Sequence, residues 1–214
     1  MTAATYAGHL SNGDGLLASK GHKPTHDGLF KVVFAQGSFT SHLEASTDFQ
    51  KGQTITFMSP HASSSKIVSY STVQVGEQSH IELNSDLLYC NHSCDPNVRF
   101  DVSGDNLTWA AIAEKNINKG DVLTFFYPST EWNMAQPFNC NCSTSKCLNK
   151  ISGASHIPSR ILKDYFLNAH IVRLKRDQIE QGQGLEALET GETKDERIKA
   201  FLDGRQDVLN RPRK

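Results

Sequence analysis

Three of the five cysteines lie within eight residues, in the pattern Cys140-x-Cys142-x4-Cys147. Zinc binds four soft ligands in a tetrahedron, and a Cys-x-Cys pair with a third cysteine close by can occupy three of its corners. Cys90 and Cys94 are the remaining thiols that could complete such a site. The pattern predicts a structural zinc site, and three unrelated buried cysteines are the plainer alternative.

Two other interpretations of the cysteines are less favoured. The opening MTAATYAGHLSNGDG has neither a basic start nor an apolar run, so it does not resemble a secretory signal. Disulfides are therefore disfavoured, and clustered cysteines in a reducing compartment more often bind metal. A zinc held by three thiols and water would be catalytic, but the spare thiols favour a closed four-thiolate site. We expect a cytoplasmic or nuclear protein.

A dense polar string, NHSCDPN, occupies residues 91–97, and a β-favouring run, INKGDVLTFFY, ends at Tyr127. Considered alone, Asp-Pro-Asn is a turn, and its polar neighbours can bond the local backbone. His92 would then be a satisfied, partly buried histidine. Tyr127 would be a strand-end tyrosine packed in the core.

Composition limits the classes of function. The 214 residues carry a net charge of −1, without the basic field that drives general nucleic-acid binding, so we expect no direct nucleic-acid contact. No run approaches the roughly 18 apolar residues of a membrane span. The 37% hydrophobic fraction suffices for a packed core, and the length suits one domain with an appendage.

The elements that would position these residues are mainly short strands. Turn signals separate β-favouring runs at residues 29–35, 43–58 with a turn at 48–52, 67–75, 80–83, 98–102, 107–113 and 122–126. The pattern changes near residue 158, after which helical spacing predicts a helix over 160–181, ended by Gly182. A second helix is expected over 194–202, with Thr193 as its cap. Gly182-x-Gly184 follows a helix, so we interpret it as a helix end and not as a nucleotide loop.

Three motifs together carry a family resemblance. NHSCDPN resembles the signature of SET-domain protein methyltransferases, INKGDVLTFFY resembles the family's second signature, and the cysteines with Leu148 resemble its post-SET tail. The motifs occur in the family's order and cover about residues 40–150. The stretch PSTEWNMAQPFNC, residues 128–140, resembles small stand-alone members known mainly from fungal and bacterial genomes.

The resemblance implies a mainly β fold of small sheets with a pseudoknot, a zinc-binding post-SET segment and C-terminal helices. It places a SET domain at 29–136 and a post-SET zinc segment at 137–152. Composition adds a loosely held lead-in at 1–28, rich in Gly, His, Ser and Thr, and the helical pattern adds an extension at 158–214, whose polar end, residues 205–214, is expected to be disordered.

The resemblance also implies roles by position. Cys94 would be the fourth ligand of the zinc ion, and Cys90 would pack in the core. Tyr127 would point its hydroxyl into a methyl-transfer channel, which Tyr70 could line, although a half-buried strand tyrosine is an equal interpretation of Tyr70. The positions expected to bind S-adenosylmethionine are Ser41, His42, Leu43, Asn91, His92, Tyr127 and Leu148.

One departure from the family pattern concerns the cofactor loop. Family members carry Gly-x-Gly where this chain has Thr40-Ser41-His42, although Leu43 to Gly52 match the next part of the family pattern. Glycine serves where backbone needs positive φ or approaches a ligand closely. Thr40 and His42 could crowd the methionine moiety of the cofactor or contact it differently.

The motifs leave three functions open. The first is a zinc-stabilised methyltransferase that acts on lysine in a protein. The second is a related enzyme with a small-molecule substrate, with or without methyl transfer. The third is a non-catalytic binding module whose C-terminal helices contact a partner.

Overall fold

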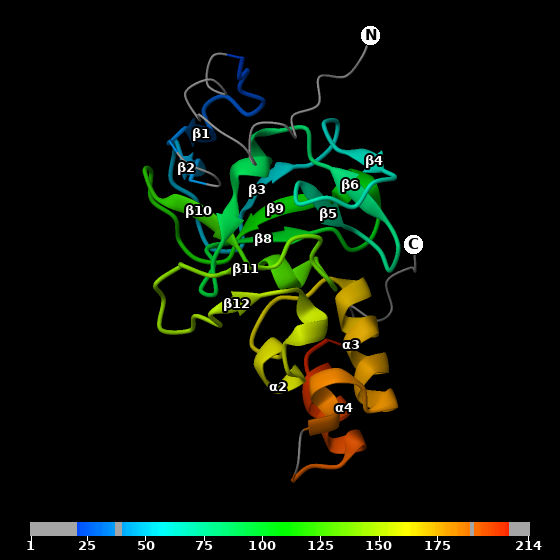
Figure 1. Cartoon of the computed structure of the whole chain (residues 1–214). Helices are drawn as coiled ribbons and strands as arrows, with labels where there is room; N and C mark the ends of the chain where they lie inside the picture. The colour runs from blue at the N-terminus through cyan, green and yellow to red at the C-terminus, as the bar shows by residue number, and fades with distance from the viewer. Residues whose placement is uncertain (1–20, 37–39, 189–190, 206–214) are drawn as a thin grey trace.

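The computed structural model of the chain describes residues 21–36, 40–188 and 191–205. Short strands in small sheets form one part of the molecule, and the helices gather beyond them at one end (Figure 1). The mainly β class of small sheets is confirmed. The strands are β1 Phe30–Val33, β2 His42–Ala45, β3 Thr54–Phe57, β4 Ser63–Ser65, β5 Thr72–Gln74, β6 His80–Glu82, β7 Asn91–His92, β8 Val98–Asp101, β9 Ala110–Ala113, β10 Val122–Phe125, β11 Phe138–Asn139 and β12 Lys150–Ile151.

The strands form four small sheets. Their orders are β1-β2-β10-β7, β3-β9-β8, β4-β6-β5 and the pair β11-β12. β7 runs parallel to β10, with Asn91 opposite Thr124 and His92 opposite Phe125. The polar string at 91–97 therefore starts beside the strand that leads to Tyr127.

Two predicted strands are shorter than expected. Of the run at 67–75 only Thr72–Gln74 is β5, because the preceding residues form turns that leave Ile67 and Val68 exposed. Of the run at 107–113 only Ala110–Ala113 is β9, and a 3-10 turn, Asn106–Thr108, precedes it. β4, β7, β11 and β12 were not predicted, since a run of serines and strands of two residues show no alternating pattern.

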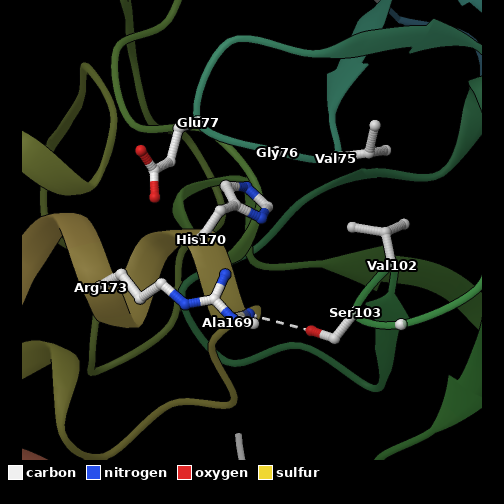
Figure 2. Close-up of a pocket in the computed structure, with 9 residues that line it drawn as sticks. Val75, Gly76, Glu77, Val102, Ser103, Ala169, His170 and Arg173 are labelled. Atoms are coloured by element: carbon white, nitrogen blue, oxygen red, sulfur yellow. Dashed lines mark hydrogen bonds between the residues drawn. The ribbon is translucent and has the colours of Figure 1, made fainter. Parts of the chain in front are cut away.

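The helices after residue 158 are α2 Ser159–Leu162, α3 Ala169–Gln181 and α4 Lys194–Leu202. The continuous helix predicted over 160–181 is wrong, because residues 163–168 leave the helical path. α3 begins beside the end of β8, where the Ala169 N–H donates to Ser103 Oγ at 2.9 Å (Figure 2). The predicted ends are correct: Gly182 is left-handed with φ 59°, and Thr193 forms a capping box with Glu196. Among the described residues, no helix has the length and apolar character to cross a membrane.

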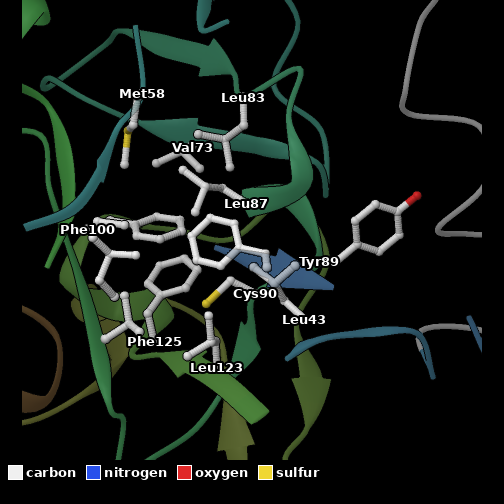
Figure 3. Close-up of a cluster of buried hydrophobic side chains, with 14 of the residues drawn as sticks. Leu43, Met58, Val73, Leu83, Leu87, Tyr89, Cys90, Phe100, Leu123 and Phe125 are labelled. Atoms are coloured by element: carbon white, nitrogen blue, oxygen red, sulfur yellow. The ribbon is translucent and has the colours of Figure 1, made fainter. Parts of the chain in front are cut away.

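Two apolar clusters form the core. The larger lies among the small sheets, where the rings of Phe100 and Phe125 stack with centroids 4.1 Å apart (Figure 3). Cys90 is 2% exposed in this cluster, as expected for core packing, and burial raises the pKa of its thiol. The second cluster joins Phe126 to Ile157, Leu162 and the apolar face of α3.

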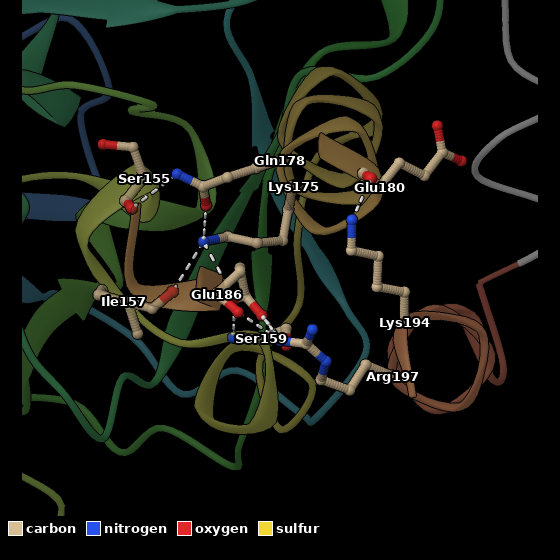
Figure 4. Close-up of polar contacts among 9 residues, drawn as sticks. All are labelled: Ser155, Ile157, Ser159, Lys175, Gln178, Glu180, Glu186, Lys194 and Arg197. Atoms are coloured by element: carbon tan, nitrogen blue, oxygen red, sulfur yellow. Dashed lines mark hydrogen bonds and ion pairs between the residues drawn. The ribbon is translucent and has the colours of Figure 1, made fainter. Parts of the chain in front are cut away.

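A buried ionic network also fastens the helical extension. The Glu186 carboxylate accepts hydrogen bonds from the N–H (2.7 Å) and Oγ (3.0 Å) of Ser159 and lies 3.4 Å from Arg197 Nη1 (Figure 4). Lys175 is fully buried and donates to the Ile157 carbonyl at 2.8 Å. Burial lowers the pKa of Lys175 to about 8, although Glu186 opposes this shift.

The segment before β1 is fastened where the structure describes it. The buried Asp86 carboxylate accepts from His22 Nε2 at 2.8 Å and from the backbone N–H groups of Thr25 (2.9 Å) and His26 (3.2 Å). The expectation of a loosely held lead-in is wrong for residues 22–26, because Asp86 supplies partners for their polar groups. Residues 1–20 and 206–214 lie outside the described part, including the polar end for which disorder was expected.

Candidate functional site

The four predicted metal ligands come together. The Sγ atoms of Cys94, Cys140, Cys142 and Cys147 all lie within 4.8 Å of one another, and the pair Cys94–Cys140 is 3.9 Å apart. A tetrahedral zinc ion with Zn–S bonds of about 2.3 Å needs sulfurs roughly 3.8 Å apart. The thiol set and its spacing therefore fit one zinc ion.

The loop between β11 and β12 brings three of these thiols together. Its backbone reverses at Ser143 and Asn149, which adopt φ 56° and φ 63°. The Cys147 N–H donates to the Thr144 carbonyl at 3.1 Å, which closes the turn between Cys142 and Cys147. The fourth thiol arrives from the turn after β7, and the Leu148 N–H donates to Cys94 Sγ at 3.3 Å.

Hydrogen bonds also reach the sulfurs from side chains. Thr144 Oγ1 lies 3.3 Å from Cys142 Sγ. Burial alone would raise the pKa of Cys142, but hydrogen bonds from Thr144 and neighbouring groups outweigh it and bring the pKa to about 6. This thiol is therefore prepared to bind a cation as a thiolate.

His92 connects the cysteine cluster to Tyr127. The Tyr127 N–H donates to His92 Nδ1 at 3.2 Å, so Nδ1 carries no proton. The proton of the neutral ring is then on Nε2, which lies 3.3 Å from Cys94 Sγ and donates to it. Burial lowers the pKa of His92 to about 4, which keeps the ring neutral.

The Tyr127 side chain points to the strand opposite. Its hydroxyl donates to the Cys90 carbonyl at 3.3 Å, directly before Asn91. Burial raises the pKa of Tyr127, so the hydroxyl stays protonated near neutral pH. It can donate and accept hydrogen bonds there, but it cannot serve as a strong base.

Asn91 extends the site to the loop between β1 and β2. Its Nδ2 donates to the Ser41 carbonyl at 2.9 Å. Hydrogen bonds thus link Ser41 to Asn91, and Tyr127 to His92. Cys94 receives hydrogen bonds from both His92 and Leu148. Asn91 and His92 are consecutive in β7, which joins the two groups. Most of the predicted site residues are therefore connected in one region.

Comparison with known proteins identifies the family. The SET-domain model matches residues 41–128. Methyltransferase flvH of Aspergillus flavus is 36% identical over 149 residues, which cover 70% of this chain and 82% of that protein. The chain belongs to the SET-domain methyltransferase family.

Two histone enzymes also match this SET protein. The H3 lysine-36-specific histone-lysine N-methyltransferase of Debaryomyces hansenii is 33% identical over 76 residues, which cover 35% of this chain and 10% of that protein. The H3 lysine-36-specific enzyme of Mycosarcoma maydis is 33% identical over 97 residues, which cover 44% of this chain and 9% of that protein. Most of each histone enzyme therefore lies outside the match.

The residues that replace the family's glycines cause no backbone strain. Positive φ occurs at three described non-glycine residues, and Thr40, Ser41 and His42 are not among them. Thr40 Oγ1 donates to the carbonyls of Gln36 (2.9 Å) and Ala35 (3.2 Å), so its side chain helps to close the loop. His42 Nε2 lies 3.1 Å from Glu44 Oε1 on the same strand. The substitution is thus compatible with the fold, and any crowding would be with the cofactor itself.

Other predicted positions are less directly connected. Leu43 is fully buried in the larger cluster, and its strand pairs with β1 on one side and β10 on the other, so its role in cofactor binding stays a prediction. The Leu148 side chain packs against the second cluster. Tyr70 is half-buried in the turn before β5. The sheet of β5 is not the sheet of β10, which leads to Tyr127, so the role of Tyr70 in the substrate channel stays a prediction.

Sequence reasoning missed Glu131 and Phe138. The Phe138 ring contacts the rings of His92 and Tyr127 edge-on, with centroids 5.7 and 6.1 Å away. Glu131 Oε1 accepts from the Gln74 N–H at 2.8 Å, while Gln74 Oε1 accepts from the Trp132 N–H at 2.8 Å. Burial raises the pKa of Glu131 to about 7. Both residues lie in the stretch at 128–140 that resembles small stand-alone members, which was the available signal.

Proposed function

We propose that this SET domain transfers a methyl group from S-adenosylmethionine to the side-chain amine of a lysine in a protein. The observation that carries the proposal is the contact between the Tyr127 hydroxyl and the Cys90 carbonyl, beside Asn91 and His92. Membership of a methyltransferase family supports the reaction class.

The residues support a mechanism based on positioning. S-adenosylmethionine, when bound, supplies an electrophilic methyl group. The protonated Tyr127 hydroxyl and the Cys90 carbonyl form a polar pair that can orient an incoming amine and stabilise charge beside it. Because Tyr127 is not a strong base, the amine must lose its proton before it is methylated.

Other residues would hold the cofactor. Asn91, His92 and Ser41 are joined by backbone and side-chain contacts and would bind it mainly through backbone groups. His42 and Leu148 would border the site, and Leu43 would hold the strand between them and the core.

A zinc ion would be held by Cys94, Cys140, Cys142 and Cys147. It would act structurally, since four thiolates leave no open position for substrate. It would join the β11–β12 segment to the turn after β7.

The test combines cofactor binding with methyl transfer. Calorimetry with S-adenosylmethionine should give saturable binding, and Tyr127→Phe should keep Kd within about 2-fold while kcat falls by about 100-fold or more. Val122→Thr, which changes an exposed side chain of β10, is a control that should leave both values unchanged. Absence of binding at millimolar cofactor would contradict the proposal and favour a non-catalytic module.

A small-molecule substrate is the second candidate. It is favoured by the relative that covers most of this chain, whose name gives methyltransferase without a protein substrate, whereas the histone enzymes match over about a tenth of their length. The two candidates differ in where the methyl group goes when the protein is incubated with cell extract and radiolabelled S-adenosylmethionine. The protein-lysine proposal predicts label in protein lysines. Label that is absent from protein but present in a small molecule other than S-adenosylmethionine would contradict the protein substrate and support this alternative.

A further inference from the structure

The C-terminal extension packs directly behind the turn that carries Tyr127. Three consecutive aromatic residues, Phe125, Phe126 and Tyr127, face different surroundings. Phe125 belongs to the larger core cluster, Phe126 belongs to the cluster of the extension, and the Tyr127 hydroxyl reaches the Cys90 carbonyl. The backbone at Tyr127 is therefore held between the small sheets and the extension.

Tyr165 makes the first contact of the extension with this turn. Its ring stacks on Phe126 with centroids 3.8 Å apart and planes 11° apart. Its hydroxyl donates to the Cys94 carbonyl at 2.9 Å. A single side chain thus touches the residue before Tyr127 and the backbone of a predicted zinc ligand.

Asn168 makes the second contact. Its side chain is fully buried, donates to the carbonyls of Phe100 (2.8 Å) and Ser129 (3.0 Å), and accepts from the Val102 N–H (2.8 Å). Its own N–H also donates to the Ser129 carbonyl at 3.1 Å. Asn168 therefore ties β8 to the 3-10 turn Tyr127–Ser129.

The start of α3 completes the arrangement. Asn168 is the residue before α3 but caps it with no side-chain hydrogen bond, because that side chain is committed to β8 and Ser129. The Ala169 N–H bonds Ser103 Oγ instead (Figure 2). His170 Nε2 lies 2.7 Å from the Thr130 carbonyl and is itself buried. Asn168 thus binds the carbonyl of Ser129, and the first turn of α3 binds the carbonyl of Thr130.

We propose that residues 165–170 form a positioning element for catalysis, in which Tyr165 and Asn168 fix the turn that carries Tyr127. The inference rests on the proposed role of the Tyr127 hydroxyl. Tyr165 and Asn168 both lie in the segment 163–168, which separates α2 from α3 and makes these contacts with the turn. A displacement of a reacting group by about 1 Å can cost on the order of 100-fold in rate, so contacts behind Tyr127 affect turnover without touching substrate.

The experiment uses the full chain labelled with 3-fluorotyrosine. The chain has five tyrosines, and Tyr127→Phe identifies the ¹⁹F resonance of Tyr127 by removing it. Tyr165→Leu removes the stack on Phe126, and Tyr165→Phe keeps the stack but removes the bond to Cys94. Phe201→Leu is the matched control, because it shortens a buried aromatic residue of the same cluster on α4.

The expected result separates positioning from general destabilisation. Tyr165→Leu should shift the Tyr127 resonance and lower kcat by about 10-fold or more, with Kd for S-adenosylmethionine within about 2-fold. Tyr165→Phe should recover most of kcat. Phe201→Leu should lower the midpoint of thermal unfolding while the resonance and kcat stay at their wild-type values.

Two outcomes would overturn the inference. One is an unshifted Tyr127 resonance in folded Tyr165→Leu, and the other is an equal loss of kcat in Tyr165→Leu and Phe201→Leu. If the wild-type protein transfers no methyl group, the proposed function fails, but the resonance still decides whether Tyr165 positions Tyr127. Asn168→Ser offers a second variant with the same ¹⁹F readout if Tyr165→Leu does not fold.

Discussion

His92 is the residue at which the cysteine cluster and the tyrosine meet. Its two ring nitrogens have different partners, the Tyr127 N–H on one side and Cys94 Sγ on the other. A metal-bound thiolate accepts hydrogen bonds more strongly than a thiol, so metal binding would also fix the orientation of this ring. A single neutral imidazole therefore couples the two halves of the site.

Glu131 gives a prediction at the residue scale. Burial raises the pKa of Glu131 from 4.5 to about 7, so the folded state keeps a proton that the unfolded chain has lost. The folded state binds more protons between these values, and this carboxyl therefore makes the free energy of unfolding fall as pH rises from about 4.5 to about 7. Glu131→Gln removes that dependence and keeps an oxygen for the Gln74 N–H.

As pH rises from 5 to 8, the free energy of unfolding of Glu131→Gln should increase by about 1–3 kcal/mol relative to that of the wild type. Urea unfolding at each pH measures this difference. If plots of the free energy of unfolding against pH stay parallel for Glu131→Gln and the wild type, the prediction is contradicted.

At the scale of elements, the β11–β12 segment is expected to depend on the proposed zinc ion for its stability. It contains only short strands, and Ile151 is the one residue of these two strands that is buried. Such a segment gains its stability from ligation more than from apolar burial. The metal would thus fasten this segment to the turn after β7.

We expect one zinc ion per chain by elemental analysis, and a strong chelator should lower the midpoint of thermal unfolding. Cys94→Ala should lose the zinc. Cys90→Ala should keep it, because Cys90 lies in the core, although lost packing will reduce its stability. A chain without zinc, or equal zinc content in both variants, would contradict the four-thiolate site.

Gly153 joins β12 to the helical extension and gives a second prediction at this scale. It has φ 109°, and an added Cβ would lie 2.4 Å from the Trp132 carbonyl oxygen and 2.8 Å from the Asn133 Cα. Gly120 has a similar φ of 93° but open space around it. A side chain at either position would have a strained backbone conformation. At Gly153 it would also push away the backbone of Trp132 and Asn133.

Gly120→Ala should cost about 1–2 kcal/mol in the free energy of unfolding, from backbone strain alone. Gly153→Ala should cost at least about 2 kcal/mol more, because two backbone segments must separate. Chemical denaturation of both variants measures this difference. Equal losses would mean that the 132–133 segment moves aside at little cost.

At the scale of the whole molecule, two clusters share one segment. Phe125 lies in the core of the sheets and Phe126 lies in the core of the extension. Because adjacent residues belong to different clusters, neither cluster can open without moving the other at this point. The SET core and the extension should therefore unfold together.

The two tryptophans test this cooperativity. Trp109 is buried in the larger cluster, and Trp132 packs against the second cluster under the Lys175 ammonium. Trp132→Phe leaves Trp109 as the fluorescent reporter, and Trp109→Phe leaves Trp132. Each variant's fluorescence curve in urea should coincide with its own circular dichroism curve. An earlier fluorescence transition in Trp109→Phe would show that the extension unfolds independently.

Much of the site could be predicted from local patterns. The spacing of Cys140, Cys142 and Cys147 indicated a metal site, and the motifs around Asn91 and Tyr127 indicated the family. Local signals also located the end of α3 at Gly182 and the start of α4 at Thr193. These features depend on neighbours within a few residues, so the sequence contains their causes.

Other features were decided by tertiary structure. Spacing alone left Cys90 and Cys94 equivalent as a fourth ligand, and the fold buries the first in the core while it brings the second to the cluster. The pattern over 160–181 predicted one helix, which the bonds of Asn168 to β8 and Ser129 interrupt. Burial on folding raises the pKa of Glu131 and outweighs the opposing hydrogen bond from the Gln74 N–H, 57 residues earlier. In each case the deciding partner is distant in the chain, and hydrogen bonds or burial formed on folding outweigh a local preference that is worth at most about 1 kcal/mol per residue.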